Sequence, residues 1–251
     1  MPVVDTDIVA YGSAVMPEDD TTTNIGGAID VTTRVVFTDI AATGTVGVYS
    51  SDAGDNQNVT ITGRDSSGVI VSETLTLNGT TKVTGTQNFE RILKIVLSAA
   101  ATGTVTVEDN QATPNKIVDI EPGVTTIRRI FYNASADVAG GSVRKYYEKI
   151  FIKNNNSTSA LLSAQIAEQS DPSTKIAFAL EGTLDGNDTN GTGNNRLVAP
   201  TGYTFDSTTK NVAGGDLLAG SAQGVWLELT LNPGDAAQKT TYTLRTSGST
   251  T

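Results

Sequence analysis

The sequence predicts an all-β protein with two antiparallel β-sandwich domains, the second immunoglobulin-like, and little helix. Short runs rich in Val, Ile and Thr alternate apolar with polar residues, as strands do when one face is buried. Clusters of Gly, Asn, Asp and Ser separate these runs at short intervals. No segment shows a convincing 3.6-residue apolar repeat, so helix is not expected to contribute much.

The first predicted domain spans residues 1–112, and its clearest strands lie at 59–62 and 69–77, joined by a turn at 65–68. In the longer strand Leu75 and Leu77 mark the core face, on which Glu73 fits poorly. Asn78-Gly79 then predicts a tight hairpin into 80–83, because both residues tolerate a positive φ. Further strands are expected at 32–40, 45–50, 92–97 and 104–108.

The hexapeptide Ala-Ala-Thr-Gly-Thr-Val is present at both 41–46 and 100–105. We interpret it as one kind of turn, used in two places to lead into a strand. Chance repetition in a Thr-rich chain is the alternative.

The second predicted domain, residues 116–251, follows a polar, Pro-containing linker at 110–115. Short strands separated by polar turns suit an immunoglobulin-like sandwich, with Trp226 as its core aromatic residue. The stretch 182–224 is expected to be a long loop, and such loops are usually functional or mobile. The expected strands are at 117–120, 125–132, 144–153, 160–169, 175–181, 224–231 and 240–245.

The composition excludes several classes of protein. The chain has no Cys and no His, which removes disulfides, thiolate metal sites and the usual base of a hydrolase triad. Its net charge of −10 opposes binding to nucleic acid. The N-terminus lacks the pattern of a signal peptide, and no apolar run has the length of a membrane helix. We therefore expect a soluble, non-enzymatic protein made in a cytosol, with no cofactor and with neither nucleic acid nor membrane as a partner.

Two acidic segments are candidates for a chemical site. Residues 185–191 are rich in oxygen ligands, but an EF-hand reading places Asn190 at the glycine position and Arg196 at the bidentate glutamate position. An irregular calcium site stays open beside the simpler interpretation of a solvated turn. Glu168 and Asp171 could form a glycosidase acid pair, but carbohydrate clefts usually carry several Trp residues and this chain has one.

A candidate partner-binding face lies on the predicted strand at 144–153. Ile150 and Ile152 mark one face of this strand as the core side. A face of cations and aromatic rings suits docking on an acidic protein surface. The alternative is a solvated face whose lysine stems cover the rings. The residues of this opposite face are Lys145, Tyr147, Lys149, Phe151 and Lys153.

The apolar-rich stretch at 3–15 has two interpretations. It can be an extended arm that adds to the sheet of a neighbouring subunit, or the first strand of its own domain. The sequence favours neither.

Several of these segments resemble sequences that are common in structural proteins of tailed bacteriophages. The first set is Val-Thr-Ile-Thr-Gly-Arg-Asp at 59–65, Ser-Glu-Thr-Leu-Thr-Leu-Asn-Gly-Thr-Thr at 72–81 and Phe-Glu-Arg-Ile at 89–92. The second set is 146–154, 224–231 and Gly-Asp-Ala-Ala at 234–237. The resemblance spans most of the chain and rests on strand-and-turn patterns. It implies a virion component without catalytic residues.

Within that group the resemblance is greatest to a capsid decoration, or cement, protein. It implies attachment to the outer surface of the capsid, with the major capsid protein lattice as partner. It also implies that the chain binds as a homo-oligomer, with a trimer favoured. A tail, collar or host-adhesion component is the alternative, with 182–224 as a receptor-facing loop. A carbohydrate-binding module would need an exposed Trp, and an enzyme working by carboxylates alone would need an acid pair in a cleft.

Overall fold

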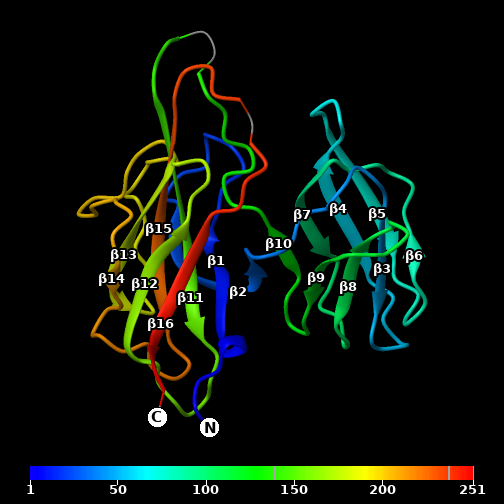
Figure 1. Cartoon of the computed structure of the whole chain (residues 1–251), viewed down its shortest axis with the longest axis horizontal. Coiled ribbons are helices and arrows are strands. Elements are labelled where there is room, and N and C mark those ends of the chain that lie inside the picture. Colours follow the sequence, from blue (N-terminus) through cyan, green and yellow to red (C-terminus); the bar gives the residue numbers. More distant parts are fainter. Residues whose placement is uncertain (138–139, 237, 251) are drawn as a thin grey trace. The chain divides into compact units, whose positions relative to one another are not determined.

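The computed structural model describes residues 1–137, 140–236 and 238–250, and it confirms the all-β class. In the described chain the one helical element is a short 3-10 turn at Asp5–Asp7. The chain forms two compact units (Figure 1). Unit 1 contains Met1–Asp30 and Phe131–Thr251, and unit 2 contains Val31–Ile130.

These units differ from the domains expected at 1–112 and 116–251. The first thirty residues belong with the C-terminal segment, so unit 1 is discontinuous in sequence. The cause is β1 (Ile8–Val15), which pairs antiparallel with β11 (Arg144–Asn154) in register Ile8↔Asn154 to Gly12↔Ile150. The N-terminal stretch is therefore a strand of its own unit and not a free arm.

Unit 1 has two antiparallel sheets. In the larger sheet the order is β13-β15-β11-β1, with the first half of β2 (Gly26–Arg34) also in this unit. The smaller sheet has the order β14-β12-β16. The remaining strands of the unit are β12 (Leu162–Ser170), β13 (Ile176–Leu184), β14 (Lys210–Asn211), β15 (Ala222–Leu231) and β16 (Thr243–Ser249).

The core of unit 1 lies along β11 and β15. Every residue of β11 from Tyr146 to Ile152 is buried, so this strand is covered on both faces. Trp226 on β15 is completely buried, as expected. Its ring lies so close to Gly26 that a Cβ there would come within 2.6 Å, and the φ of Gly26 is +103°. Only glycine suits that position.

Unit 2 is a sandwich of two sheets. One has the order β10-β7-β4-β5, and the other β6-β3-β8-β9. The pairs inside these two sheets are antiparallel, whereas the second half of β2 pairs in parallel with β10 through Thr33↔Thr126. The strands are β3 (Val46–Ser50), β4 (Asn58–Arg64), β5 (Ile70–Thr76), β6 (Val83–Thr84), β7 (Arg91–Leu97), β8 (Val105–Asp109), β9 (Lys116–Ile120) and β10 (Thr126–Arg128).

The strand patterning of unit 2 is confirmed. Leu75 and Leu77 are buried in its core, while Thr74 and Thr76 are exposed. The poorly fitting Glu73 has a structural task, because its carboxylate accepts hydrogen bonds from the backbone N–H groups of Thr86 and Gln87. It thereby holds the segment that follows β6.

The expected Asn78-Gly79 hairpin is wrong in one respect. A turn does form, with Thr81 N–H donating to the Asn78 carbonyl and Gly79 at φ +54°. However, β5 pairs with β4 and β6 pairs with β3, so the turn carries the chain from one sheet to the other. Gly79 also hydrogen-bonds to Ser50 and Asp55, which docks the turn on the end of β3.

Both copies of the hexapeptide lead into strands, as expected. The strands are β3 and β8, which pair antiparallel from Val46↔Asp109 to Ser50↔Val105. The two turns are held differently. Gly44 exchanges backbone hydrogen bonds with Phe89, whereas the N–H groups of Thr102 and Gly103 donate to the carboxylate of Asp55.

The strand expected at 32–40 lies earlier, at Gly26–Arg34. A glycine pair opens this strand, and glycine is not a strand signal, which is why the pattern missed its start. The strand expected at 125–132 is shorter, at Thr126–Arg128, and the one expected at 240–245 extends to Ser249.

Candidate functional site

The expected basic face of β11 is not a solvent-facing ladder. Tyr147, Lys149 and Phe151 are buried, with Lys149 and Phe151 at 0% exposure. Lys145 is exposed and Lys153 half-buried, one near each end of the strand. The structure thus corrects this premise of a docking surface.

The long segment 182–224 covers Tyr147 and Lys149, whereas Phe151 packs with Tyr11 and Val9 of β1. Tyr203 and Phe205 pack against the cluster of Tyr147 and Trp226. Their ring centroids lie 5.4 Å apart for Tyr147 and Phe205, and 6.0 Å apart for Tyr203 and Trp226. The segment therefore supplies part of the core of unit 1, which a pattern of alternating residues on β11 alone cannot reveal.

At the centre of this cluster is a fully buried ion pair. The Lys149 ammonium lies 2.6 Å from Oε1 of Glu181, and the two side chains are 0% and 1% exposed. Lys149 also donates to the carbonyls of Gly27, at 2.7 Å, and Asp188, at 3.1 Å. The Glu181 carboxylate in turn accepts the backbone N–H of Asp188.

Burial dominates the electrostatics of this pair. Desolvation lowers the pKa of Lys149 and raises the pKa of Glu181, and the attraction between the two groups opposes both shifts. The ammonium also lies 4.6 Å from the ring centre of Phe151 and 5.7 Å from that of Trp226. All three ammonium protons have acceptors, so Lys149 anchors β11, β13, β2 and the 185–191 segment to one another.

The outer cations of β11 also bind within the chain. Lys145 pairs with Glu228 at 2.8 Å, and the Tyr147 hydroxyl donates to the other oxygen of the same carboxylate. Burial and this carboxylate raise the pKa of Tyr147. Lys153 donates to the carbonyl of Gly220 at 2.5 Å. Each of the three lysines of this face therefore already has a hydrogen-bond acceptor within the chain.

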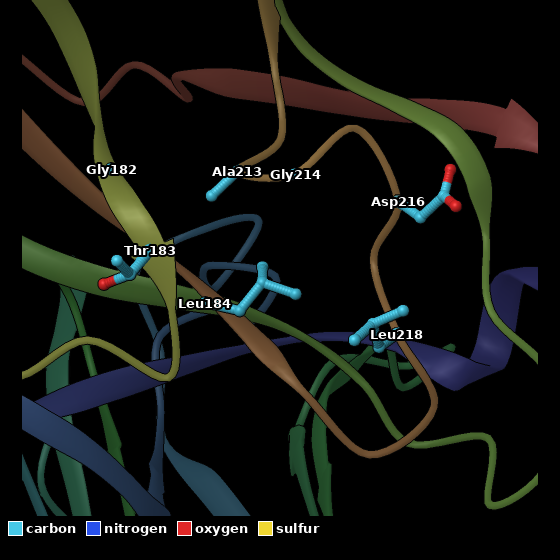
Figure 2. A pocket seen from close by; sticks show the side chains of 7 residues that line it. All are labelled: Gly182, Thr183, Leu184, Ala213, Gly214, Asp216 and Leu218. Atoms are coloured by element: carbon cyan, nitrogen blue, oxygen red, sulfur yellow. The ribbon is translucent and has the colours of Figure 1, made fainter.

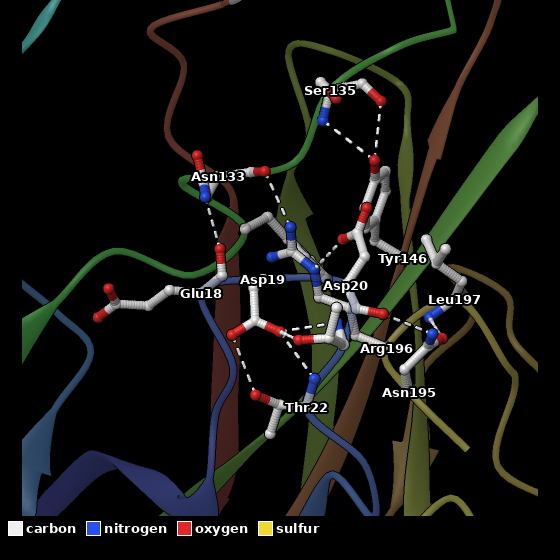
Figure 3. Close-up of polar contacts among 12 residues, drawn as sticks. Glu18, Asp19, Asp20, Thr22, Asn133, Ser135, Tyr146, Asn195, Arg196 and Leu197 are labelled. Carbon is white, nitrogen blue, oxygen red and sulfur yellow. Dashed lines mark hydrogen bonds and ion pairs between the residues drawn. The ribbon is translucent and has the colours of Figure 1, made fainter. Parts of the chain in front are cut away.

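A second buried cation, Arg196, fastens three segments of unit 1 (Figure 3). Its guanidinium pairs with Asp20 at 2.8 Å, donates to the carbonyl of Asn133 at 2.8 Å, and lies 4.9 Å from the ring centre of Tyr146. Asn195 donates to the carbonyl of Asp20 in the same clasp. No sequence signal pointed to Arg196, because its partners are far away in the chain.

The oxygen-rich segment 185–191 uses its side chains internally. Asp185 accepts the N–H of Ala222, and Asp188 accepts the Tyr203 hydroxyl at 2.5 Å. Asn190 accepts the N–H of Ile25. Across the described residues, no group of three or more acidic side chains is placed to hold a metal ion.

Of the suggested acid pair Glu168 and Asp171, Asp171 stabilises a turn. Asp171 accepts hydrogen bonds from the N–H groups of Ser173, Lys175 and Ile176, which together outweigh its burial and lower its pKa. The pKa of Glu168 is raised, first by burial and then by the charge of Asp171. The carboxylate of Asp171 is thus committed to the turn that precedes β13.

One open hollow of about 380 Å³ lies on unit 1 beside the end of β13 (Figure 2). Its one ionisable side chain is Asp216, whose carboxylate already accepts the N–H of Ser163 at 2.8 Å. The hollow can receive an apolar group but offers no acid–base pair. Its lining is Gly182, Thr183, Leu184, Ala213, Gly214, Asp216 and Leu218.

Comparison with known proteins returned no match to a protein family, a curated protein or a solved structure. Within the described residues, no helix has both the length and the apolar character needed to cross a membrane.

Proposed function

We propose that this chain is a non-enzymatic structural protein of a tailed-phage virion, which decorates and stabilises the outer capsid surface. The observation that carries the proposal is the use of buried charge in unit 1. The side chains of Lys149, Glu181 and Arg196 are each at most 1% exposed, and Lys149 and Arg196 form ion pairs with Glu181 and Asp20 of the same unit. Such groups tie long loops to a sheet and make a rigid sandwich, which suits a protein under sustained mechanical load.

The sequence resemblance at 59–65 and 72–81 supports the same proposal. These residues form β4, β5 and the turn after β5, which belong to the scaffold of unit 2. In this proposal the partner is the major capsid protein lattice, the chain binds it as a homo-oligomer, and the chain is made in the host cytoplasm before it joins the virion. The contact surface is not the buried face of β11.

A tail, collar or host-adhesion role is the second candidate. Leu197 and Val198 are 40% and 42% exposed, side by side on a segment that Arg196 and Asn195 anchor. Neighbouring apolar side chains on a fixed loop suit contact with a receptor. A carbohydrate-binding role has less support, because Trp226 is buried.

Copy number in purified virions tests the proposal. Quantitative mass spectrometry should find on the order of hundreds of copies per particle, as a lattice-wide decoration requires. About six to twelve copies would assign the chain to the tail or collar instead, since those parts have low cyclic symmetry. Absence of the chain from washed particles would overturn both assignments.

A further inference from the structure

The outer edge of β5 in unit 2 presents unused backbone groups. Among the described strands, β5 pairs only with β4 and is the last strand of its sheet. The N–H of Leu77 donates to Gln57 and the N–H of Asp65 to the carbonyl of Val69, at the two ends of this pairing. The backbone N–H and C=O groups of odd-numbered residues in β5 therefore point toward β4, and those of the even-numbered residues point away from it. Those residues are Ile70, Ser72, Thr74 and Thr76.

In the described part of unit 2, no hydrogen bond occupies these outward groups. The four side chains are exposed, uncharged and mostly β-branched. Two large apolar side chains, Val69 at 58% and Ile70 at 49%, are exposed where the strand begins. An edge with unpaired backbone and no Lys or Pro among its outward residues is a template for another strand.

Two other edge strands, β9 and β13, are protected, in contrast to β5. On β9 the carbonyl of Ile117 accepts the N–H of Thr38, and Lys116 pairs with Asp119. On β13 the backbone of Phe178 exchanges hydrogen bonds with Asp206. The protection seen on these strands is the kind that natural sheets use against strand addition.

A second copy of the same strand fits this edge. An antiparallel pair with Ser72 opposite itself sets Ile70 opposite Thr74 of the second copy and covers the exposed Val69 and Ile70. Glu73 then lies opposite Val71, so two carboxylates are not brought together. The outward residues of β5 carry no charge. Two chains, each with a net charge of −10, can therefore approach each other at this edge with little local repulsion.

The row of hydroxyl groups continues through this two-fold axis. Thr62 and Ser72 hydroxyls lie 3.4 Å apart, and those of Thr60 and Thr74 lie 2.9 Å apart on the same face. With Ser72 on the axis, the Thr62–Ser72 hydroxyl pair of one copy meets the same pair of the other, whereas Thr74 lies opposite Ile70 and makes no hydroxyl contact with the second copy. Cross-strand hydroxyl contacts of this kind add to the backbone hydrogen bonds.

We propose that unit 2 self-associates through the edge of β5, by antiparallel addition of β5 from a second copy about a two-fold axis at Ser72. The interface is isologous and forms a closed dimer. It does not depend on where the chain is located in a virion.

The test compares Thr74→Pro with Thr74→Val in the full chain. Proline removes only an outward N–H and is tolerated on an edge strand, so the pairing of β5 with β4 should remain. Valine keeps the N–H and the shape of the side chain. By sedimentation velocity over a concentration series, wild type and Thr74→Val should dimerise equally, and Thr74→Pro should raise the dimer dissociation constant at least about tenfold.

A charge variant makes the test independent of proline. Ser72→Lys places two ammonium groups opposite each other at the axis, so it should dissociate the dimer at low salt and recover it partly at high salt. Circular dichroism checks that each variant is folded. Wild-type protein that stays monomeric at about 0.1 mM, or a dimer that both variants leave intact, overturns the proposal. Presence or absence of the chain in virions is a separate result, which tests the proposed function alone.

Discussion

At the scale of single residues, unit 1 is held together in part by buried charged side chains. Lys149 occupies a position where strand alternation predicts solvent, yet it is completely buried and bonded to Glu181. Two ions taken out of water are stable together only if each keeps its partners. The carbonyls of Gly27 and Asp188 complete the set around the ammonium.

Lys149→Met should lower the free energy of unfolding by about 3–5 kcal/mol, because Glu181 is then left buried without its counter-ion. The double variant Lys149→Met/Glu181→Leu should recover most of that loss, since neither charge remains. Urea unfolding of the two variants measures the effect. Lys145→Met is the matched control on the same strand face, and its half-exposed pair with Glu228 should contribute at most about 1 kcal/mol. A loss for Lys149→Met as small as that of the control would contradict the anchoring role.

At the scale of elements, the N-terminal strand connects the two ends of the chain. β1 extends the large sheet of unit 1 by pairing with β11, and Tyr11 packs with Phe151 in a small buried cluster. The alternative of an arm reaching to another subunit is thereby replaced by a strand within the unit. Its partner lies about 140 residues away in sequence, and no local pattern reports such pairing.

Deletion of residues 1–12 should therefore destabilise unit 1 and leave unit 2 folded. The deletion removes the whole described register between β1 and β11 and exposes a buried strand edge. Limited proteolysis with mass spectrometry should show new cleavage sites in 131–251 and continued protection in 31–130. Removal of Met1 alone, a residue that is 95% exposed, is the control. Equal protection of both segments after the longer deletion would show that β1 is dispensable.

At the scale of the whole molecule, each unit has a carboxylate whose ionised form the fold stabilises. The Ser50 hydroxyl, with N–H groups of the second hexapeptide turn, lowers the pKa of Asp55 in unit 2 to about 2. Lys210 and Thr208 lower the pKa of Asp206 in unit 1 to about 2. Both groups titrate near 3.8 in the unfolded chain, so the unfolded chain binds protons first on acidification.

The stability from Asp55 should thus be fully present above about pH 4 and be lost as the pH falls toward about 2. Thermal unfolding of wild type and Asp55→Asn, followed between about pH 5 and about pH 2, tests this. The wild-type midpoint should fall more steeply with acid than that of the variant, and the two curves should converge at the acid end. Parallel curves would mean that Asp55 is not stabilised in its ionised form.

The sequence by itself determined the all-β class, the faces of β5 and the turn at 65–68, because these follow from alternation and turn chemistry between near neighbours. It also placed Trp226 in a core and the two hexapeptides before strands. Each of these properties depends on residues close together in the chain.

Only the tertiary structure decided how distant segments combine. In the structure β1 pairs with β11, and the Asn78-Gly79 turn connects two different sheets. The segment 182–224 packs over part of β11. That segment covers Tyr147 and Lys149, and Tyr11 of β1 packs on Phe151, so the middle of the face that was expected to meet solvent is buried. The physical reason is that strand alternation says which side chains share a face, whereas burial depends on what covers that face, and here the cover comes from far along the chain.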